Sequence, residues 1–263
     1  MDLSGAVALV TGANRGIGRA IAEELARQPL DLVLVGTRSL DKHEPLEPPP
    51  GGAREVRPVV VDLSSREAVE RSWAGLADEP PLDLLVNNAG QLSGGLLEEQ
   101  DVEDIYSMFQ VNLVGLVDLT RRALPGMLER GHGKIVNNAS ISGYAWLPAA
   151  TTYAAAKTGV VAFSESLRRE LKDTGVSVLH LVTPGVDTDM LDATKEVYSG
   201  HTSTSGWDEI PASEWAAKVV RAIESDAHVL GPGGKTALAK LASRGPAFLL
   251  DAVSDRMFSR DPR

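Results

Sequence analysis

Short apolar segments alternate with longer amphipathic ones along most of the chain, and this alternation constrains the fold more than any other feature. Strands that alternate with helices in this way predict a parallel sheet covered on both faces, the α/β doubly wound architecture. We expect strands at Ala6–Val10, Leu32–Val35, Val56–Val61, Leu82–Val86, Lys134–Ala139, Val176–Val182 and His228–Leu230. We expect helices at Gly16–Gln28, Ser64–Ala77, Val102–Leu128, Tyr153–Lys172 and Ser213–Ser225.

Two stretches interrupt this pattern. His43–Pro58 contains the run Pro-Pro-Pro-Gly-Gly, which forbids a long regular helix and predicts a short turn followed by an exposed loop. Val186–Pro211 is irregular, and its Ser-, Thr- and Gly-rich part, Gly200–Gly206, is interpreted as a mobile lid. The sequence therefore predicts a single domain over 1–234, which includes a substrate loop over 186–211, and a helical extension over 235–263.

Composition excludes several classes of function. The chain of 263 residues has a formal charge of -10, which argues against binding to a nucleic-acid backbone. It has no cysteine, so disulfides, thiolate zinc sites and cysteine nucleophiles are excluded, and no metal-binding residues are assigned. No secretory signal or membrane-spanning run is evident, and we expect a cytoplasmic protein.

The segment Lys235–Arg263 has apolar residues at helical spacing and more lysine and arginine than aspartate. We interpret it as a helix that packs on its own domain or on a partner subunit, and we expect a homodimer or homotetramer. An alternative is a helix that lies on a membrane surface.

A glycine-rich turn, Thr11–Gly18, joins the first strand to the first helix. In a strand–turn–helix context, glycines let the backbone approach a pyrophosphate, and the helix N-terminus supplies free N–H groups; the alternative is a plain chain reversal. The residues of this turn expected to bind a dinucleotide are Gly12, Asn14, Arg15, Gly16, Ile17 and Gly18.

The second strand is followed by Arg38 rather than by the carboxylate that would bind a ribose 2′-hydroxyl. Arg38 and Arg15 are both suited to pairing with a 2′-phosphate. This pattern favours NADP(H) over NAD(H), although both arginines could also be solvated surface charges.

Tyr153 and Lys157 lie four residues apart at the start of a predicted helix, so their side chains share a face. A nearby ammonium lowers a phenol's pKa, which would make Tyr153 a general acid or base. Ser140 ends the fifth strand at the edge where such folds bind ligands, and its hydroxyl could bind the same substrate oxygen. The alternatives are an exposed helix face and a serine that bonds local backbone groups.

These motifs together resemble the short-chain dehydrogenase/reductase family, whose domains have the Rossmann-type fold. The resemblance covers about residues 5–232 and rests on Thr11–Gly18, Asn87–Gly90, Asn112, Ser140, Tyr153, Lys157 and Pro184–Gly185. It implies that Tyr153 donates a proton to a carbonyl oxygen that Ser140 polarises. Lys157 would lower the pKa of Tyr153 and hold the nicotinamide ribose, and Asn112 would support a water in a proton relay.

The resemblance also implies further cofactor contacts, at Asp62, Leu63, Asn88, Ala89, Gly90, Tyr153, Lys157, Pro184, Gly185, Val186 and Thr188. Asn87 and Asn88 could instead stabilise the central sheet, and Asn112 could pin a helix bend. The segment from Pro184 to Thr188 is one residue shorter than the family's commonest form, which puts Thr188 in doubt as a ligand.

The predicted activity is hydride transfer between NADP(H) and a carbonyl or secondary alcohol. Tyr144, Trp146, Leu147 and Met190 suggest an apolar pocket for a lipophilic ketone or aldehyde, although Trp146 could pack beneath its loop. The alternatives are a non-catalytic NADP-binding sensor or scaffold, and a sugar-nucleotide epimerase or dehydratase, for which the C-terminal region leaves little room.

Overall fold

The computed structural model describes residues 1–42, 44–201, 209–232 and 258–259. Its strands are β1 (Val7–Thr11), β2 (Leu32–Thr37), β3 (Glu55–Val60), β4 (Leu84–Asn87), β5 (Gly133–Asn138), β6 (Val176–Leu181), β7 (Gly185–Asp187), β8 (Glu209–Pro211) and β9 (Val229–Leu230). Its α-helices are α1 (Gly16–Ala26), α2 (Arg66–Ala74), α3 (Val102–Phe109), α4 (Leu116–Arg130), α5 (Thr151–Glu170), α6 (Asp189–Ser199) and α7 (Ala212–Glu224). Shorter helical turns are η1 (Leu40–Lys42), η2 (Leu97–Glu99), the π-helical η3 (Gln110–Gly115) and η4 (Ile141–Gly143).

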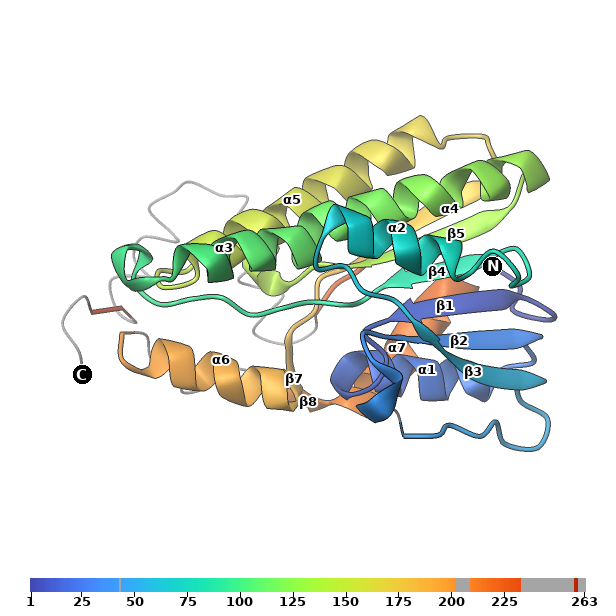
Figure 1. Ribbon diagram of the computed structural model, residues 1–263, viewed down its shortest axis with the longest axis horizontal. Coiled ribbons are helices and arrows are strands. Elements are labelled where there is room, and N and C mark those ends of the chain that lie inside the picture. Colours follow the sequence, from blue (N-terminus) through green and yellow to red (C-terminus); the bar gives the residue numbers. More distant parts are fainter. Residues whose placement is uncertain (43, 202–208, 233–257, 260–263) are drawn as a thin grey trace.

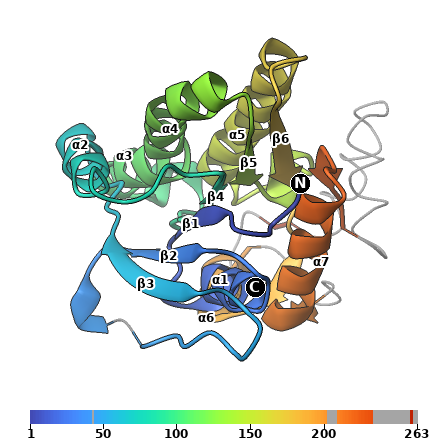
Figure 2. The same ribbon diagram turned by 90° about the vertical axis from the view of Figure 1, so that its right-hand side faces the viewer.

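A seven-stranded sheet in the order β3-β2-β1-β4-β5-β6-β9 forms the centre of the molecule, and all its strands are parallel. Helices α2, α4 and α5 cover one face, and α1 and α7 cover the other (Figures 1 and 2). The predicted doubly wound α/β fold is confirmed. Strand order reverses between β1 and β4, so the crevice that binds ligands in this architecture lies at their carboxyl ends.

Apolar packing explains the two helical layers. Fully buried side chains of β1 and β2 alternate between the two faces, with Ala8 and Val10 in the cluster that contains α1 and α7, and Leu9 in the cluster beneath α4. Alternation of this kind is what a parallel sheet buried on both faces requires. The hydroxyl of Ser65 accepts a hydrogen bond from the backbone N–H of Ala68 and caps α2.

The proline-rich stretch forms a loop in place of a helix. Arg19 of α1 donates to the backbone carbonyls of Glu44 and Pro45, at 2.6 and 3.1 Å. The backbone N–H of Ala53 donates to the carbonyl of Ala26 at 2.9 Å. The predicted turn and loop are therefore confirmed, and the loop is attached to α1 along its length.

The long helix predicted over Val102–Leu128 is confirmed, and it contains the π-helical turn η3 between α3 and α4. One prediction of secondary structure is wrong, because the stretch Val186–Pro211, predicted to be irregular, contains β7, β8 and the eleven-residue α6. Most of the proposed lid at Gly200–Gly206 lies outside the described residues.

Most of the predicted C-terminal extension also lies outside the described residues, apart from Phe258 and Ser259. These two lie beside the end of α6, where the N–H of Ser259 donates to the carbonyl of His201 at 2.8 Å. The ring of Phe258 is 6.4 Å from the imidazole of His201. In the described part of the chain, no helix is both long and apolar enough to cross a membrane.

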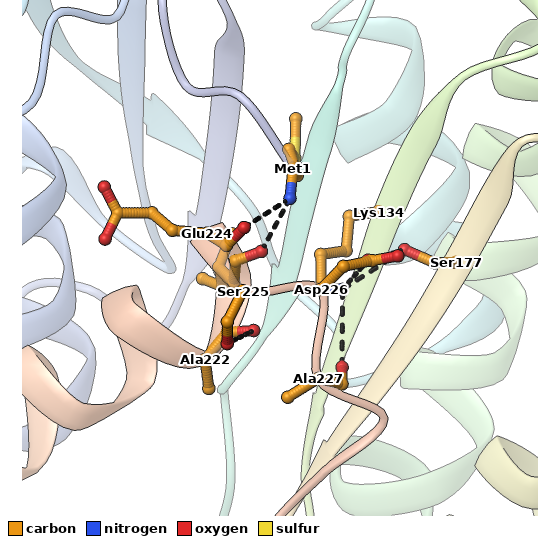
Figure 3. Close-up of polar contacts among 9 residues, drawn as sticks. Met1, Lys134, Ser177, Ala222, Glu224, Ser225, Asp226 and Ala227 are labelled. Carbon is orange, nitrogen blue, oxygen red and sulfur yellow. Dashed lines mark hydrogen bonds and ion pairs between the residues drawn. The ribbon is translucent and has the colours of Figure 1, made fainter.

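An ion pair fastens the last strand at the amino-terminal edge of the sheet (Figure 3). The side chain of Lys134, at the start of β5, is fully buried and donates to the carboxylate of Asp226, just before β9. The hydroxyl of Ser177 in β6 donates to the same carboxylate oxygen at 2.7 Å. The three residues thus join β5, β6 and the segment that leads into β9.

Candidate active site

The glycine-rich turn has no room for side chains at its key positions. A Cβ at Gly12 would lie 2.8 Å from the Cα of Ala89, and one at Gly18 would lie 2.3 Å from the carbonyl oxygen of Gly12. Gly12 and Gly16 also have φ values of 62° and 55°, in the left-handed region that favours glycine. The turn therefore needs its glycines both for backbone conformation and for close approach.

The N-terminus of α1 is open for an anion. Its N-cap residue, Arg15, makes no side-chain capping bond, and the first turn contains no acidic residue. The first N–H groups of a helix have no partner within the helix, and the helix dipole favours negative charge there. This part of the site is suited to a phosphate group.

Asn88 holds the turn in place. Its amide nitrogen donates to the carbonyls of Thr11 and Gly12, at 3.1 and 3.3 Å, and its amide oxygen accepts from Asn138 at 2.9 Å. The neighbouring Asn87 donates to Asn137 and Thr120, each at 2.9 Å. Both asparagines therefore have the sheet-stabilising role that the sequence left open, and the Asn88 side chain positions the turn.

Arg15 and Arg38 lie at the same edge of the sheet. The N–H of Ala13 donates to the carbonyl of Gly36 at 2.9 Å, which joins the glycine-rich turn to the end of β2, and Arg38 is exposed two residues further on. Nη1 of Arg15 lies 3.6 Å from Oδ2 of Asp189 at the start of α6. Both partners of this ion pair are largely exposed, so solvent screens it.

The other predicted cofactor residues differ in their placement. Thr188 lies against the turn, with its Cγ2 3.4 Å from an ideal Cβ at Gly16, despite the shortened segment that precedes it. Val186 is buried among core residues, and Leu63 is buried beside Gly115. Asp62 accepts a hydrogen bond from the N–H of Ser64 at 2.9 Å. Leu63 and Val186 thus have packing roles that the motifs did not predict.

Ser140, Tyr153 and Lys157 come together at the carboxyl end of β5. The Ser140 hydroxyl lies near enough to the Tyr153 phenol to lower its pKa. Nζ of Lys157 is 5.7 Å from the centre of the Tyr153 ring and donates to the carbonyl of Asn138 at 2.8 Å. Tyr153 lies in the first turn of α5, and Ser140 caps the turn η4 by accepting from the N–H of Ser142 at 3.1 Å.

Burial controls the protonation of both titratable groups. It raises the pKa of Tyr153 to about 12, against the opposing effect of the nearby Ser140 side chain. It lowers the pKa of Lys157 to about 8. At neutral pH the Tyr153 phenol is therefore protonated, and Lys157 is charged in most molecules.

Asn112 lies in η3 and contacts the loop that follows β4. Its amide oxygen accepts from the N–H of Gln91 at 2.7 Å, and its amide nitrogen donates to the Gln91 carbonyl at 2.8 Å. An ideal Cβ at Gly90 would lie 3.5 Å from this amide oxygen and 3.9 Å from Nζ of Lys157. Asn112 and Lys157 therefore lie around the same glycine.

Sequence reasoning missed two buried residues that position this group. Asn138 accepts from Lys157 through its carbonyl and donates to Asn88 through its side chain. The hydroxyl of Thr183 donates to the amide oxygen of Asn138. A signal was present, because the chain has an Asn-Asn pair at the end of each of two predicted strands, at Asn87–Asn88 and Asn137–Asn138.

The predicted apolar pocket needs one correction. Tyr144 is buried and its hydroxyl lies 2.8 Å from Nε2 of His180 in β6. Trp146 is 56 % exposed and donates to the hydroxyl of Thr158 at 3.1 Å, so it does not pack beneath its loop. Met190 is also partly exposed, near the start of α6.

Comparison with known families agrees with this geometry. The family model described as "short chain dehydrogenase" matches residues 6–198. The chain belongs to the short-chain dehydrogenase family. It is therefore an oxidoreductase enzyme, and its Rossmann-type sheet places the tyrosine, serine and lysine of this short-chain dehydrogenase at one edge.

Several relatives have named activities. The chain is 34 % identical over 235 residues to the 3-oxoacyl-(acyl-carrier-protein) reductase FabG of Haemophilus influenzae, covering 85 % of this chain and 92 % of that protein. It is also 34 % identical to a putative ketoacyl reductase of Streptomyces coelicolor, over 89 % of this chain and 93 % of the relative.

Solved structures of the family are similar over nearly the whole chain. A short-chain dehydrogenase from Burkholderia cenocepacia in complex with NADP has a TM-score of 0.81 and 26 % identity, covering 97 % of this chain and 99 % of that one. A variant of the actinorhodin polyketide ketoreductase, solved with NADPH, has a TM-score of 0.74 and 30 % identity, covering 88 % of this chain and 97 % of the other.

Proposed function

We propose that this short-chain dehydrogenase reduces the carbonyl group of a small lipophilic molecule with NADPH. The observation that carries the proposal is the placement of Ser140, directly after β5, with Tyr153 in the first turn of α5 and Nζ of Lys157 5.7 Å from the centre of the Tyr153 ring. Two hydroxyls placed together at the ligand-binding edge of the sheet can both contact one substrate oxygen. A purely cofactor-sensing protein would not need this arrangement.

The residues at this edge fit NADP(H). The free N–H groups of α1 would hold the pyrophosphate, and Arg38, with Arg15, would pair with the 2′-phosphate. When bound, NADPH supplies the hydride that is transferred to the carbonyl carbon. The complexes of the two solved relatives with NADP and NADPH support this preference.

The chain's own residues carry the proton. The phenol of Tyr153 is protonated at neutral pH because its pKa is about 12, and it donates its proton to the substrate oxygen as negative charge develops there. The hydroxyl of Ser140 holds that oxygen in place. The buried ammonium of Lys157 then stabilises the phenolate that is left behind.

The proposed substrate is a ketone or aldehyde with an apolar group. Exposed apolar side chains at the edge, Trp146 and Met190, favour such a molecule. The names of the two curated relatives describe reduction of a ketone on an acyl chain, which is a compound of this kind.

We also propose that the enzyme works as a homodimer or homotetramer. Val102, Tyr106 and Val114 expose apolar surface along α3 and η3, and exposed apolar groups of this kind are typical of interaction surfaces. Size-exclusion chromatography with light scattering measures the assembly directly, and a monomer would contradict it.

Replacing Tyr153 by Phe tests the chemistry. We expect kcat for a panel of lipophilic ketones to fall by about 10²–10⁴-fold, the usual contribution of a general acid, while NADPH binds as before. The measurements are steady-state assays and fluorescence titration of NADPH. The matched control is Tyr106→Phe, at a tyrosine that is 71 % exposed, and it should leave kcat unchanged. If Tyr153→Phe retained turnover, Tyr153 could not be the proton donor.

Replacing Arg38 by Asp tests the cofactor. A carboxylate at the end of β2 repels a 2′-phosphate but can bond a ribose hydroxyl, so the dissociation constant of NADPH should rise at least about tenfold more than that of NADH. Arg54→Asp, at an exposed arginine of another loop, serves as the control for the charge change. Equal losses for both cofactors would exclude Arg38 from phosphate recognition.

A further inference from the structure

Tyr198 is buried near the end of α6, on the side that faces the active site. Its side chain is 5 % exposed and packs with Ala149 and Ala150. These alanines come directly before α5, whose first turn carries Tyr153. The Tyr198 ring therefore contacts the segment that leads into the proton donor.

Gly94 makes the space for this ring. A Cβ at position 94 would lie 2.3 Å from Cε1 of Tyr198, a contact that real side chains do not make. The same Cβ would lie 3.1 Å from Cγ1 of Val197 and from the carbonyl oxygen of Ala149. The ring thus lies directly on the backbone of the loop that follows β4, the loop that Asn112 also holds.

The surface beneath the ring is braced by hydrogen bonds. Gln100 accepts from the hydroxyls of Thr152 and Ser93, at 2.7 and 3.2 Å, and donates to the carbonyl of Gly95 at 2.9 Å. The N–H of Gly95 donates to the carbonyl of Ala149 at 2.8 Å. The loop and the residues before Tyr153 are therefore joined into one unit.

Backbone strain occurs at the same place. Ala149 has a φ of 64°, in the left-handed region that alanine rarely adopts. Such a conformation costs free energy, persists only where surrounding contacts enforce it, and is concentrated at functional sites. Gly94, Ala149 and Ala150 together form a preformed socket for Tyr198, which we call the Tyr198 socket.

We propose that Tyr198 is a specificity-determining residue, whose ring forms a wall of the carbonyl site and limits the size of the group attached to the carbonyl. The inference rests on the proposed function and names the residue that sets substrate size. Electrostatics agree with this placement, because burial and then the neighbouring Tyr153 phenol raise the pKa of the Tyr198 phenol.

The test compares a small and a bulky ketone, ethyl acetoacetate and ethyl benzoylacetate. In Tyr198→Ala, the ratio of kcat/KM for the bulky ester to kcat/KM for the small ester should rise about tenfold or more. The reason is that each substrate carbon that gains room in a hydrophobic pocket can change kcat/KM by about tenfold or more. Tyr198→Phe keeps the ring and should keep the wild-type ratio. Gly94→Ala pushes the ring out of the Tyr198 socket and should change the ratio in the same direction as Tyr198→Ala.

Controls separate this inference from the proposed function. Leu128→Ala removes an exposed apolar side chain of α4 and should not change the ratio. Calorimetric titration of both esters into the enzyme–NADP⁺ complex measures the ratio of their affinities without turnover, and this ratio reports how far the Tyr198 ring limits substrate size. If wild type binds both esters but reduces neither, the proposed function fails while the binding ratio still tests the wall. If the ratio is unchanged in both Tyr198→Ala and Gly94→Ala, Tyr198 does not limit substrate size and the inference is rejected, whatever the turnover.

Discussion

The protonation of Tyr153 depends on its surroundings more than on its lysine neighbour. The sequence predicted that Lys157 lowers the pKa of the phenol, but in the protein alone burial outweighs this effect and raises the pKa to about 12. Lys157 directs its ammonium toward the carbonyl of Asn138 as well as lying 5.7 Å from the ring centre. A phenol that keeps its proton at neutral pH is a donor, which favours reduction of a carbonyl over oxidation of an alcohol.

Lys157 sets the expected pH dependence. Burial lowers its pKa to about 8, so the ammonium is charged below this pH and becomes neutral above it. In the proposed mechanism the charged form stabilises the Tyr153 phenolate, so kcat/KM for ketone reduction should be level below about pH 8 and fall as pH rises further. Rate profiles over pH measure this. In Lys157→Arg the charge persists across the whole range, and the fall should disappear; a fall that persists in this variant contradicts the assignment.

At the scale of elements, local patterns predicted the strands and most helices. Because the sheet is buried on both faces, each strand is a short run of apolar residues that can be recognised in the sequence. Local patterns did not predict η3, because helical periodicity runs unbroken through Gln110–Gly115. The π-turn contains Asn112, whose side chain accepts from the N–H of Gln91 and donates to its carbonyl, a contact 21 residues away in sequence. The π-turn is therefore a tertiary feature.

Helix α6 was missed although its start signals are present. Thr188 precedes it as N-cap, and Asp189 and Asp192 lie in its first turn, where negative charge favours the helix dipole. Its two buried side chains, Leu191 and Tyr198, are spaced two helical turns apart. The Tyr198 socket was not predictable, because it is formed by loops from different parts of the chain.

For the whole molecule, strand β5 runs between the amino-terminal edge of the sheet, which holds β9 in place, and the carboxyl-terminal edge, where the candidate active site lies. Ser140 follows its carboxyl end, beside Tyr153 and the glycine-rich turn, whereas Lys134 lies at its amino-terminal end and pairs with Asp226 (Figure 3). Parallel strands place all their carboxyl ends at one edge, so ligand binding is separated from the fastening of β9. Changes at the ion pair should therefore alter stability without altering the chemistry.

The two partners of this ion pair differ in burial, and this predicts an asymmetry. The Lys134 side chain is fully buried and the Asp226 side chain is 54 % exposed. Burial lowers the pKa of Lys134 against the pull of Asp226, while hydrogen bonds from Lys134 and Ser177 overcome the effect of burial and lower the pKa of Asp226. Asp226→Asn leaves an ammonium buried without its counter-charge, whereas Lys134→Met leaves a carboxylate that water can reach.

We therefore expect Asp226→Asn to lower the free energy of unfolding by about 3 kcal/mol, the low end for one partner of a buried pair, and Lys134→Met to lower it less. Urea unfolding measures both, and Lys218→Met, in an exposed pair of α7, should change it by under about 0.5 kcal/mol.

The same ion pair predicts a pH dependence of stability. The pKa of Asp226 is lower in the folded protein than in the unfolded chain, where it is about 3.9, so the ionised carboxylate stabilises the fold above that pH. This contribution is lost as the pH falls through the pKa of the folded protein. The wild-type advantage over Asp226→Asn should therefore shrink below about pH 4. A larger loss in Lys134→Met than in Asp226→Asn would show that packing of the lysine stem, rather than its charge, fastens β9.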